Sequence, residues 1–188
     1  MGVPKAELPF GPETMLQRVV RVLGEAVQPI VVVSAAGQAL PPLPEHVIAA
    51  RDLREGRGPL EGLRAGLEAL QGLAEAAYVT GCDAPLLLPE FVRRMMQLLG
   101  EHDAAVPVDG GFHHPLAAIY RVRVLPQVAQ LLDANDLRPV FLYERVSTRR
   151  VPVEELKAAD PELQTLANVN CHQDYVRALA RAGFAAPA

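Results

Sequence analysis

Apolar residues follow two spacings along this chain, and the two spacings alternate. Apolar side chains at positions i, i+3, i+4 and i+7 predict amphipathic helices over 14–23, 59–70, 90–99, 125–132, 140–145 and 172–182. Short, mainly apolar runs predict strands over 29–34, 47–49, 76–79, 104–108, 116–120 and 148–153. Alternation of helices and strands predicts a three-layer α/β/α domain of Rossmann-like type, with a mostly parallel sheet.

Glycine and proline positions refine this outline. Residues 1–11 are interrupted by Pro and Gly too often to form an element, so we expect a loop there. Asp109-Gly110-Gly111 is a strong turn signal, which permits antiparallel pairing of 104–108 with 116–120. Pro152 restricts the strand at 148–153 to a sheet edge. The helix at 90–99 is expected to turn these residues inward: Phe91, Val92, Met95, Met96 and Leu99.

Composition limits the class of protein without naming a function. The chain has 188 residues, is 50% hydrophobic and carries a net charge of −4, which fits one domain over 1–188 with a sizeable core. Its 18 Lys and Arg oppose 22 Asp and Glu without a basic block, which argues against a nucleic-acid partner. Cys82 and Cys171 form no disulfide framework. With no signal-peptide pattern and no apolar run of membrane length, we expect a cytoplasmic protein with no membrane partner.

Candidate chemistry first appears where an apolar run ends in Gly81-Cys82-Asp83-Ala84-Pro85. Pro85 stops the predicted strand, which places Asp83 at its carboxyl end. Ligands bind at that edge of open α/β sheets, so Asp83 is a candidate metal or phosphate-site residue. Aspartate is also a favoured N-cap, and the alternative is that Asp83 only caps the helix that begins near Pro89.

Two other pairs of residues have competing interpretations. Gly62 and Gly66 lie four apart on the predicted helix, where they indicate either close approach of a ligand or tight packing of the helix on the sheet. His113 and His114 are adjacent, so on a strand they point to opposite faces. We therefore interpret the two histidines as structural residues rather than as a shared metal site.

Five motifs occur in a specific order, and the resemblance that they carry extends from Met1 to the last helix. They are Met1-Gly2-Val3-Pro4-Lys5-Ala6, Gly58-Pro59-Leu60-Glu61-Gly62-Leu63, Gly81-Cys82-Asp83-Ala84-Pro85, His114-Pro115-Leu116-Ala117-Ala118-Ile119-Tyr120 and Asn168-Val169-Asn170. Together they resemble the molybdenum cofactor guanylyltransferases and their nucleotidyltransferase relatives. The resemblance implies transfer of GMP from GTP to molybdopterin, with release of pyrophosphate.

The resemblance also implies roles for single residues. Asp83 would bind Mg²⁺, Lys5 would contact nucleotide phosphates, and these two would form the catalytic pair. The other nucleotide-binding residues would be Gly2, Asp52 and Gly58. One carboxylate-bound Mg²⁺ and one lysine supply the charge neutralisation that nucleotidyl transfer needs.

The asparagines of the last motif are assigned to the acceptor. Asn168 and Asn170 would lie near the pterin substrate, as acceptor-binding residues. Each of these residues has a structural alternative: Lys5 as a solvated charge, Asp52 as a turn former, and the two asparagines as cap and turn residues.

Two residues near the motifs differ from the family pattern. Ala36 stands where the family has an Asn that approaches the base. Alternatives to GTP therefore stay open, namely a CTP-dependent molybdopterin cytidylyltransferase or a sugar-phosphate nucleotidyltransferase. Cys171 stands where the family usually has Thr, and a thiol is a weaker helix cap than a hydroxyl.

A larger departure lies at the start of the chain. The family's first strand and the Leu-Ala-Gly-Gly half of its signature are absent, and Met1 falls on an internal Met of the motif. We hypothesise that translation begins upstream. Loss of a central strand would leave two rows of backbone groups unpaired, so we expect this chain to fold poorly alone and to turn over weakly. A rival hypothesis is an inactive relative that acts as a binding module. The sequence is compatible with a monomer or a weak homo-oligomer.

Overall fold

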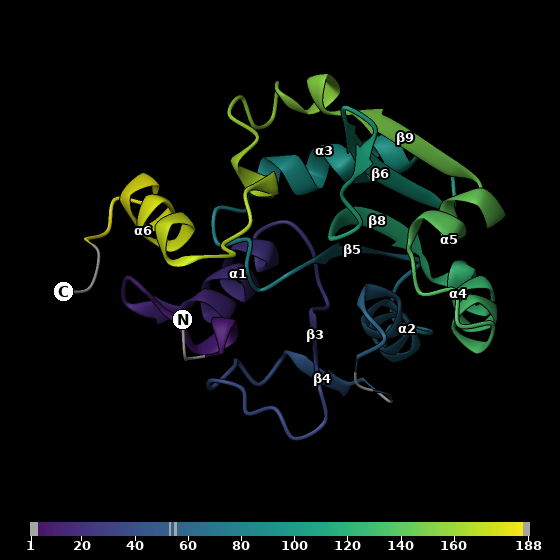
Figure 1. Ribbon diagram of the computed structural model, residues 1–188, viewed down its shortest axis with the longest axis horizontal. Coiled ribbons are helices and arrows are strands. Elements are labelled where there is room, and N and C mark those ends of the chain that lie inside the picture. The colour runs from purple at the N-terminus through teal and green to yellow at the C-terminus, as the bar shows by residue number, and fades with distance from the viewer. Residues whose placement is uncertain (1–3, 53, 55, 186–188) are drawn as a thin grey trace.

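The computed structural model describes residues 4–52, 54 and 56–185 (Figure 1). Its α-helices are α1 (Met15–Gly24), α2 (Pro59–Ala69), α3 (Pro89–Leu99), α4 (Leu125–Asp133), α5 (Val140–Arg145) and α6 (His172–Arg181). Its strands are β1 (Pro9–Phe10), β2 (Glu13–Thr14), β3 (Val31–Ser34), β4 (Ile48–Arg51), β5 (Ala76–Thr80), β6 (Ala104–Asp109), β7 (Phe112–His113), β8 (Ala117–Arg121) and β9 (Thr148–Pro152). Short 3₁₀ turns include η1 (Lys5–Glu7) and η4 (Gln164–Leu166).

Local sequence signals account for the helix ends. Thr14 caps α1 by accepting from the backbone N–H of Gln17, whose side chain accepts from the backbone N–H of Thr14 in return. Pro59 and Pro89 occupy the first positions of α2 and α3, where the missing N–H has no cost. All six helices predicted from the apolar spacing are present.

The larger sheet agrees with the predicted mostly parallel class, since β5, β6 and β9 run in one direction and β8 runs against them. β8 lies between β5 and β6 and is antiparallel to both, whereas β9 pairs parallel with β6. The physical reason for the direction of β8 is the turn at Asp109-Gly110-Gly111, which returns the chain through β7 and β8 beside β6. Among the described strands β9 pairs with β6 alone, as expected for an edge strand.

β3 and β4 form a second, separate parallel sheet. Among the described strands β3 pairs only with β4, and β5 pairs only with β8. Besides the outer edges on β4 and β9, the two sheets therefore have unpaired edges on β3 and on β5.

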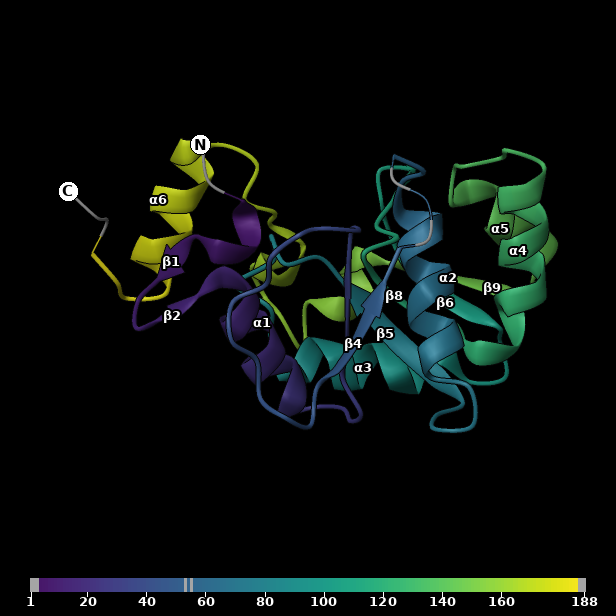
Figure 2. The same ribbon diagram turned by 90° about the horizontal axis from the view of Figure 1, so that it is seen from below.

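Helices cover both faces of the larger sheet, which confirms the three-layer α/β/α class. α1 and α3 share one apolar cluster with β3, β5 and β6. α2, α4 and α5 share a second cluster with β6 and β8, and Figures 1 and 2 show α5 beside α4. Met95 of α3 is fully buried, but Met96 is 48% exposed. The prediction that Met96 points into the core is therefore wrong, because α3 contacts its neighbours over a narrower face than we predicted.

A third apolar cluster joins the two ends of the described chain. Phe10 of β1 and Met15 of α1 pack with Tyr175 and Leu179 of α6, and Figure 2 shows α6 beside β1 and β2. Residues 1–11 were expected to be a loop, but η1 and β1 form there because this packing fixes them. No helix in the described ranges is long and apolar enough to cross a membrane.

Candidate functional site

Asp83 follows β5 in a tight turn and places its carboxylate over Gly81. The N–H of Ala84 donates to the carbonyl of Gly81 at 3.3 Å. The Asp83 carboxylate folds back over Gly81 so closely that a Cβ there would collide with Oδ1. α3 begins six residues after Asp83, and its N-cap is Leu88. The interpretation of Asp83 as the cap of this helix is therefore wrong.

Lys5 lies directly against this carboxylate. Its Nζ is 3.2 Å from Oδ2 of Asp83 and donates to Oδ1 of Asn170 at 2.8 Å. Both members of the Lys5–Asp83 ion pair are partly buried. Lys5 is therefore not an isolated solvated charge. Residues 5, 83 and 170 form one cluster, which we call the Lys5 cluster.

The segment around Asn170 is attached to the turn that carries Asp83. The N–H of Val169 donates to the backbone carbonyl of Asp83 at 2.8 Å, and Val169 is buried between two exposed asparagines. Further upstream, the hydroxyl of Thr165 accepts from the N–H of Leu88 at 3.2 Å. These two contacts hold the 165–170 segment against the 83–88 segment.

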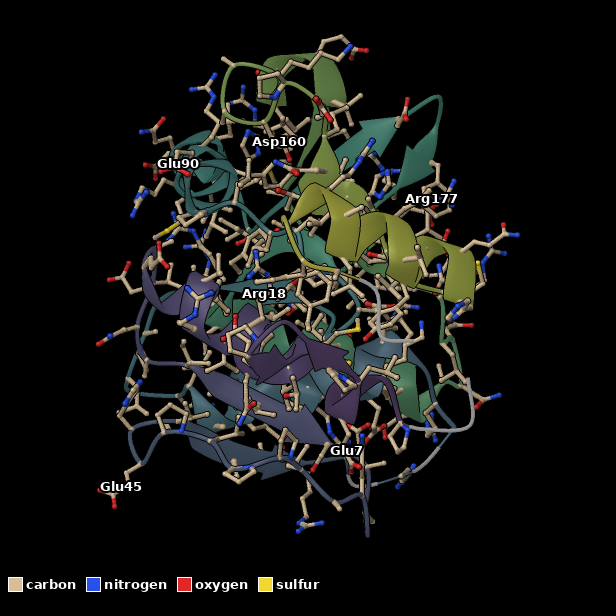
Figure 3. All side chains as sticks on the ribbon, turned by 90° about the vertical axis from the view of Figure 1, so that its left-hand side faces the viewer. Glu7, Arg18, Glu45, Glu90, Asp160 and Arg177 are labelled. Atoms are coloured by element: carbon tan, nitrogen blue, oxygen red, sulfur yellow. The ribbon has the colours of Figure 1, made fainter. Side chains whose placement is uncertain are left out.

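Asp160 and Asp174 fix the two ends of this segment. The buried Asp160 carboxylate, labelled in Figure 3, accepts from the N–H groups of Gln164 and Thr165. Asp174 accepts from the N–H groups of Asn170 and Cys171, each at 3.1 Å. Hydrogen bonds from the Cys171 side chain, from Arg177 and from these N–H groups lower the pKa of Asp174 to about 2. The N-cap of α6 is Cys171, so Asn170 is not the cap residue.

Arg18 supports the same turn from the opposite side. Its Nε donates to the carbonyl of Pro85 at 2.7 Å, and its guanidinium lies 5.0 Å from the ring centre of Phe10. Figure 3 shows Arg18 between α6 and the N-terminal segment. The sequence assigned no role to Arg18, which lies on the polar face of the predicted helix over 14–23, and it gave Gly81 only as part of a motif. A polar face and a glycine before a carboxylate were the available signals.

Asp52 and Gly58 lie apart from the Lys5 cluster. No hydrogen bond or ion pair between described residues connects either of them with residues 5, 83 or 170. Asp52 follows β4, and burial, then the negative charge of Glu61, raises the pKa of its carboxyl. Gly58 caps α2 with a φ of 70°, a left-handed conformation that disfavours other residues. Gly2 lies outside the described residues.

Gly66, His113 and His114 each contact neighbouring side chains. A Cβ at Gly66 would lie 3.6 Å from the Val33 side chain, which favours tight packing of α2 on β3. The ring of His113 stacks on Tyr143 at 5.3 Å, and that of His114 meets Phe112 edge-on at 5.0 Å. No group of three His, Cys, Asp or Glu that could hold a metal occurs in the described ranges.

The donor set at Asp83 fits a magnesium ion that retains water and nucleotide ligands. The oxygen atoms available are those of Asp83 and, across Lys5, the side-chain oxygen of Asn170. Mg²⁺ prefers oxygen ligands and is commonly bound by only one or two carboxylates together with phosphate oxygens. A single aspartate is therefore sufficient as the protein's contribution.

Residues 1–150 match the family model of the MobA-like NTP transferase domain. The chain belongs to this family. A protein from Mycobacterium avium, named a probable molybdenum cofactor guanylyltransferase, is 37% identical over 190 residues, which cover 97% of this chain and 89% of the relative. One of the same name from Methanosarcina acetivorans is 34% identical over 185 residues, covering 92% and 80%. These similarities confirm the family resemblance inferred from the five motifs.

Solved structures support the MobA-like fold. The crystal structure of molybdopterin-guanine dinucleotide biosynthesis protein A from Archaeoglobus fulgidus superposes with a TM-score of 0.77 at 20% identity. The match covers 97% of this MobA-like chain and 92% of that structure. At this level of identity the superposition establishes the α/β fold, and the chain is a nucleotidyltransferase by family.

Proposed function

We propose that this MobA-like chain transfers GMP from GTP to a molybdopterin-type acceptor and releases pyrophosphate. The observation that carries the proposal is the Lys5 cluster, in a chain whose relatives are named molybdenum cofactor guanylyltransferases. It joins the carboxylate and the lysine assigned to the nucleotide with an asparagine assigned to the acceptor.

Charge placement explains how these residues assist the reaction. A Mg²⁺ ion bound through Asp83 would neutralise charge on the nucleotide phosphates. The ammonium of Lys5 has three donors, and two of them contact Asp83 and Asn170, which leaves one for a phosphate oxygen. Asn168 and Asn170, on the segment attached to Asp83, orient the acceptor so that its oxygen approaches the α-phosphorus opposite the leaving pyrophosphate. Gly2, Asp52 and Gly58 complete the nucleotide site.

Several finer properties belong to this proposal. The protein acts as one domain in the cytoplasm, as a monomer or weak homo-oligomer, with neither nucleic acid nor membrane as a partner. GTP is preferred to CTP. A CTP-dependent molybdopterin cytidylyltransferase, a sugar-phosphate nucleotidyltransferase and an inactive binding module are the competing functions.

The test is a nucleotide panel with molybdopterin as acceptor. Pyrophosphate release is measured with GTP and with CTP, each with and without Mg²⁺. We expect weak, Mg²⁺-dependent release from GTP and its loss in Asp83→Ala, with Asp109→Ala, at the end of β6, as the control. Equal or faster turnover of CTP would favour the cytidylyltransferase. Capture of a partner without turnover of any nucleotide would favour the binding module.

A further inference from the structure

Glu61 is a buried carboxylate that the proposed reaction does not use. It lies in the first turn of α2, three residues after Gly58, and is only 1% exposed. Burial of a charged carboxylate is costly unless cations compensate for it. The neighbours of Glu61 therefore explain why the fold tolerates it.

Two arginines compensate the Glu61 charge and connect it to the loop before α2. Oε1 of Glu61 is 3.0 Å from Nη2 of Arg64, and Oε2 is 3.7 Å from Nε of Arg57. Arg57 also donates to the carbonyl of Leu132 near the end of α4. Glu61 and Arg57 thus form an ion pair, without a hydrogen bond at Arg57 Nε or at either Glu61 oxygen among the described residues. Through Leu132, Arg57, the residue before Gly58, is connected to α4.

The side chain of Asp52 lies against the same part of α2. A Cβ at Gly62 would be 3.6 Å from Oδ1 of Asp52, so this oxygen lies against the residue that follows Glu61. Oδ1 is buried and has no hydrogen-bond partner among the described residues. Burial raises the pKa of the Asp52 carboxyl, and the negative charge of Glu61 raises it further. A buried acceptor beside a second negative charge favours a ligand that brings N–H donors.

We propose that Glu61 is a positioning residue for base selection. Glu61 holds Arg57 in place and strengthens Asp52 as a hydrogen-bond acceptor for a base that presents adjacent amino and imino N–H groups. Guanine presents two such donors, whereas cytosine and adenine present an amino donor beside a ring acceptor. This inference rests on the proposed function, because it places the base of the bound nucleotide at Asp52. Glu61 acts through Asp52 and Arg57 and does not touch the nucleotide.

The test compares GTP with ITP, which lacks only the amino group. Dissociation constants are measured by NMR titration of the full chain, which resolves millimolar affinities. In Glu61→Gln we expect the preference for GTP over ITP to fall about fivefold, because a negative charge beside Asp52 is lost. Glu61→Asp keeps the charge and should retain the preference. Glu68→Gln is the matched control, since Glu68 pairs with the same Arg64 on the same helix but is 45% exposed.

Each outcome separates this inference from the proposed function. A wild-type preference for GTP that Glu61→Gln leaves unchanged would overturn the inference alone. Absence of GTP binding by the wild type would overturn the proposed function and this inference with it. If Glu61→Gln does not fold, Arg57→Gln carries the test: GTP and ITP should weaken together, and the amides of Gly56 and Gly58 should exchange faster. Unchanged affinities and exchange rates in Arg57→Gln would contradict the positioning role.

Discussion

At the scale of single residues, the position of Lys5 is the most informative feature of the site. The chain contains two lysines, Lys5 and Lys157, and Lys5 places its ammonium between a carboxylate and an amide oxygen. A lysine held in this way loses little conformational entropy when a phosphate arrives. Its charge is therefore already positioned for a phosphate.

Substitution of Lys5 tests this arrangement. In Lys5→Ala we expect Mg²⁺-dependent pyrophosphate release to fall by about 10²–10³-fold, because a positioned charge opposite the phosphates is lost. Lys157→Ala removes the other lysine, which lies at the end of a surface 3₁₀ turn, and should leave the rate unchanged. An equal loss in both variants would indicate a general charge effect instead.

At the scale of elements, the start of α6 controls the geometry of the acceptor segment. Asp174 accepts from the N–H groups of Asn170 and Cys171, so the same carboxylate caps the helix and fixes Asn170. Hydrogen bonds from Cys171, Arg177 and the backbone hold its pKa at about 2, below the ordinary value for aspartate. The stability that Asp174 contributes is consequently dependent on pH.

The sign of this dependence follows from the lowered pKa. A carboxyl whose pKa is lower in the folded than in the unfolded protein stabilises the fold when the pH is above its unfolded pKa, about 3.9. This stabilisation is lost as the pH falls toward the folded pKa. We expect Asp174→Asn to lower the melting temperature at pH 7, and the difference from wild type to shrink between pH 4 and pH 2, as measured by circular dichroism. A difference that persists unchanged at the lowest pH would exclude titration of Asp174 as its cause.

The unpaired edge of β3 is a second property at the scale of elements. Ile48 donates to the carbonyl of Ile30, and Asp52 donates to that of Ser34, so alternate residues of β3 face β4. In a parallel pair the intervening residues, Val31 and Val33, direct their N–H groups to the other edge.

Hydrogen exchange tests the state of this edge. We expect the amides of Val31 and Val33 to exchange at least about tenfold faster than those of Val32 and Ser34, because unpaired amides open without breaking a ladder bond. Heteronuclear NMR after transfer to D₂O measures each amide separately. Equal protection of all four would mean that another segment covers the β3 edge.

At the scale of the whole molecule, packing between layers sets which side of each helix is buried. Met95 and Met96 are adjacent on α3, yet Met95 is fully buried in the cluster shared with α1 and the sheet, and Met96 is 48% exposed. The layers also join the ends of the chain, since α6 packs on β1 and on the start of α1. That contact brings Lys5 to Asn170, 165 residues away in sequence.

The two methionines provide a direct test of the layer packing. Met95→Ala should lower the free energy of unfolding by about 2–5 kcal/mol, because a buried side chain is removed and a cavity remains. Met96→Ala should change it by less than about 1 kcal/mol, since most surface substitutions have small effects. Urea unfolding measures both values. Similar losses in the two variants would contradict the observed orientation of α3.

Patterns that are local in sequence determined much of this protein. Helical spacing located all six helices, the Gly81-Cys82-Asp83 turn marked the end of β5, and five ordered motifs identified the family, because each depends on neighbouring residues. Only the tertiary structure decided the antiparallel place of β8, the exposure of Met96 and the meeting of Lys5 with Asp83 and Asn170. The physical reason is that strand pairing, helix orientation and ion pairs between distant segments are set by burial of the whole core, which no short stretch of sequence contains.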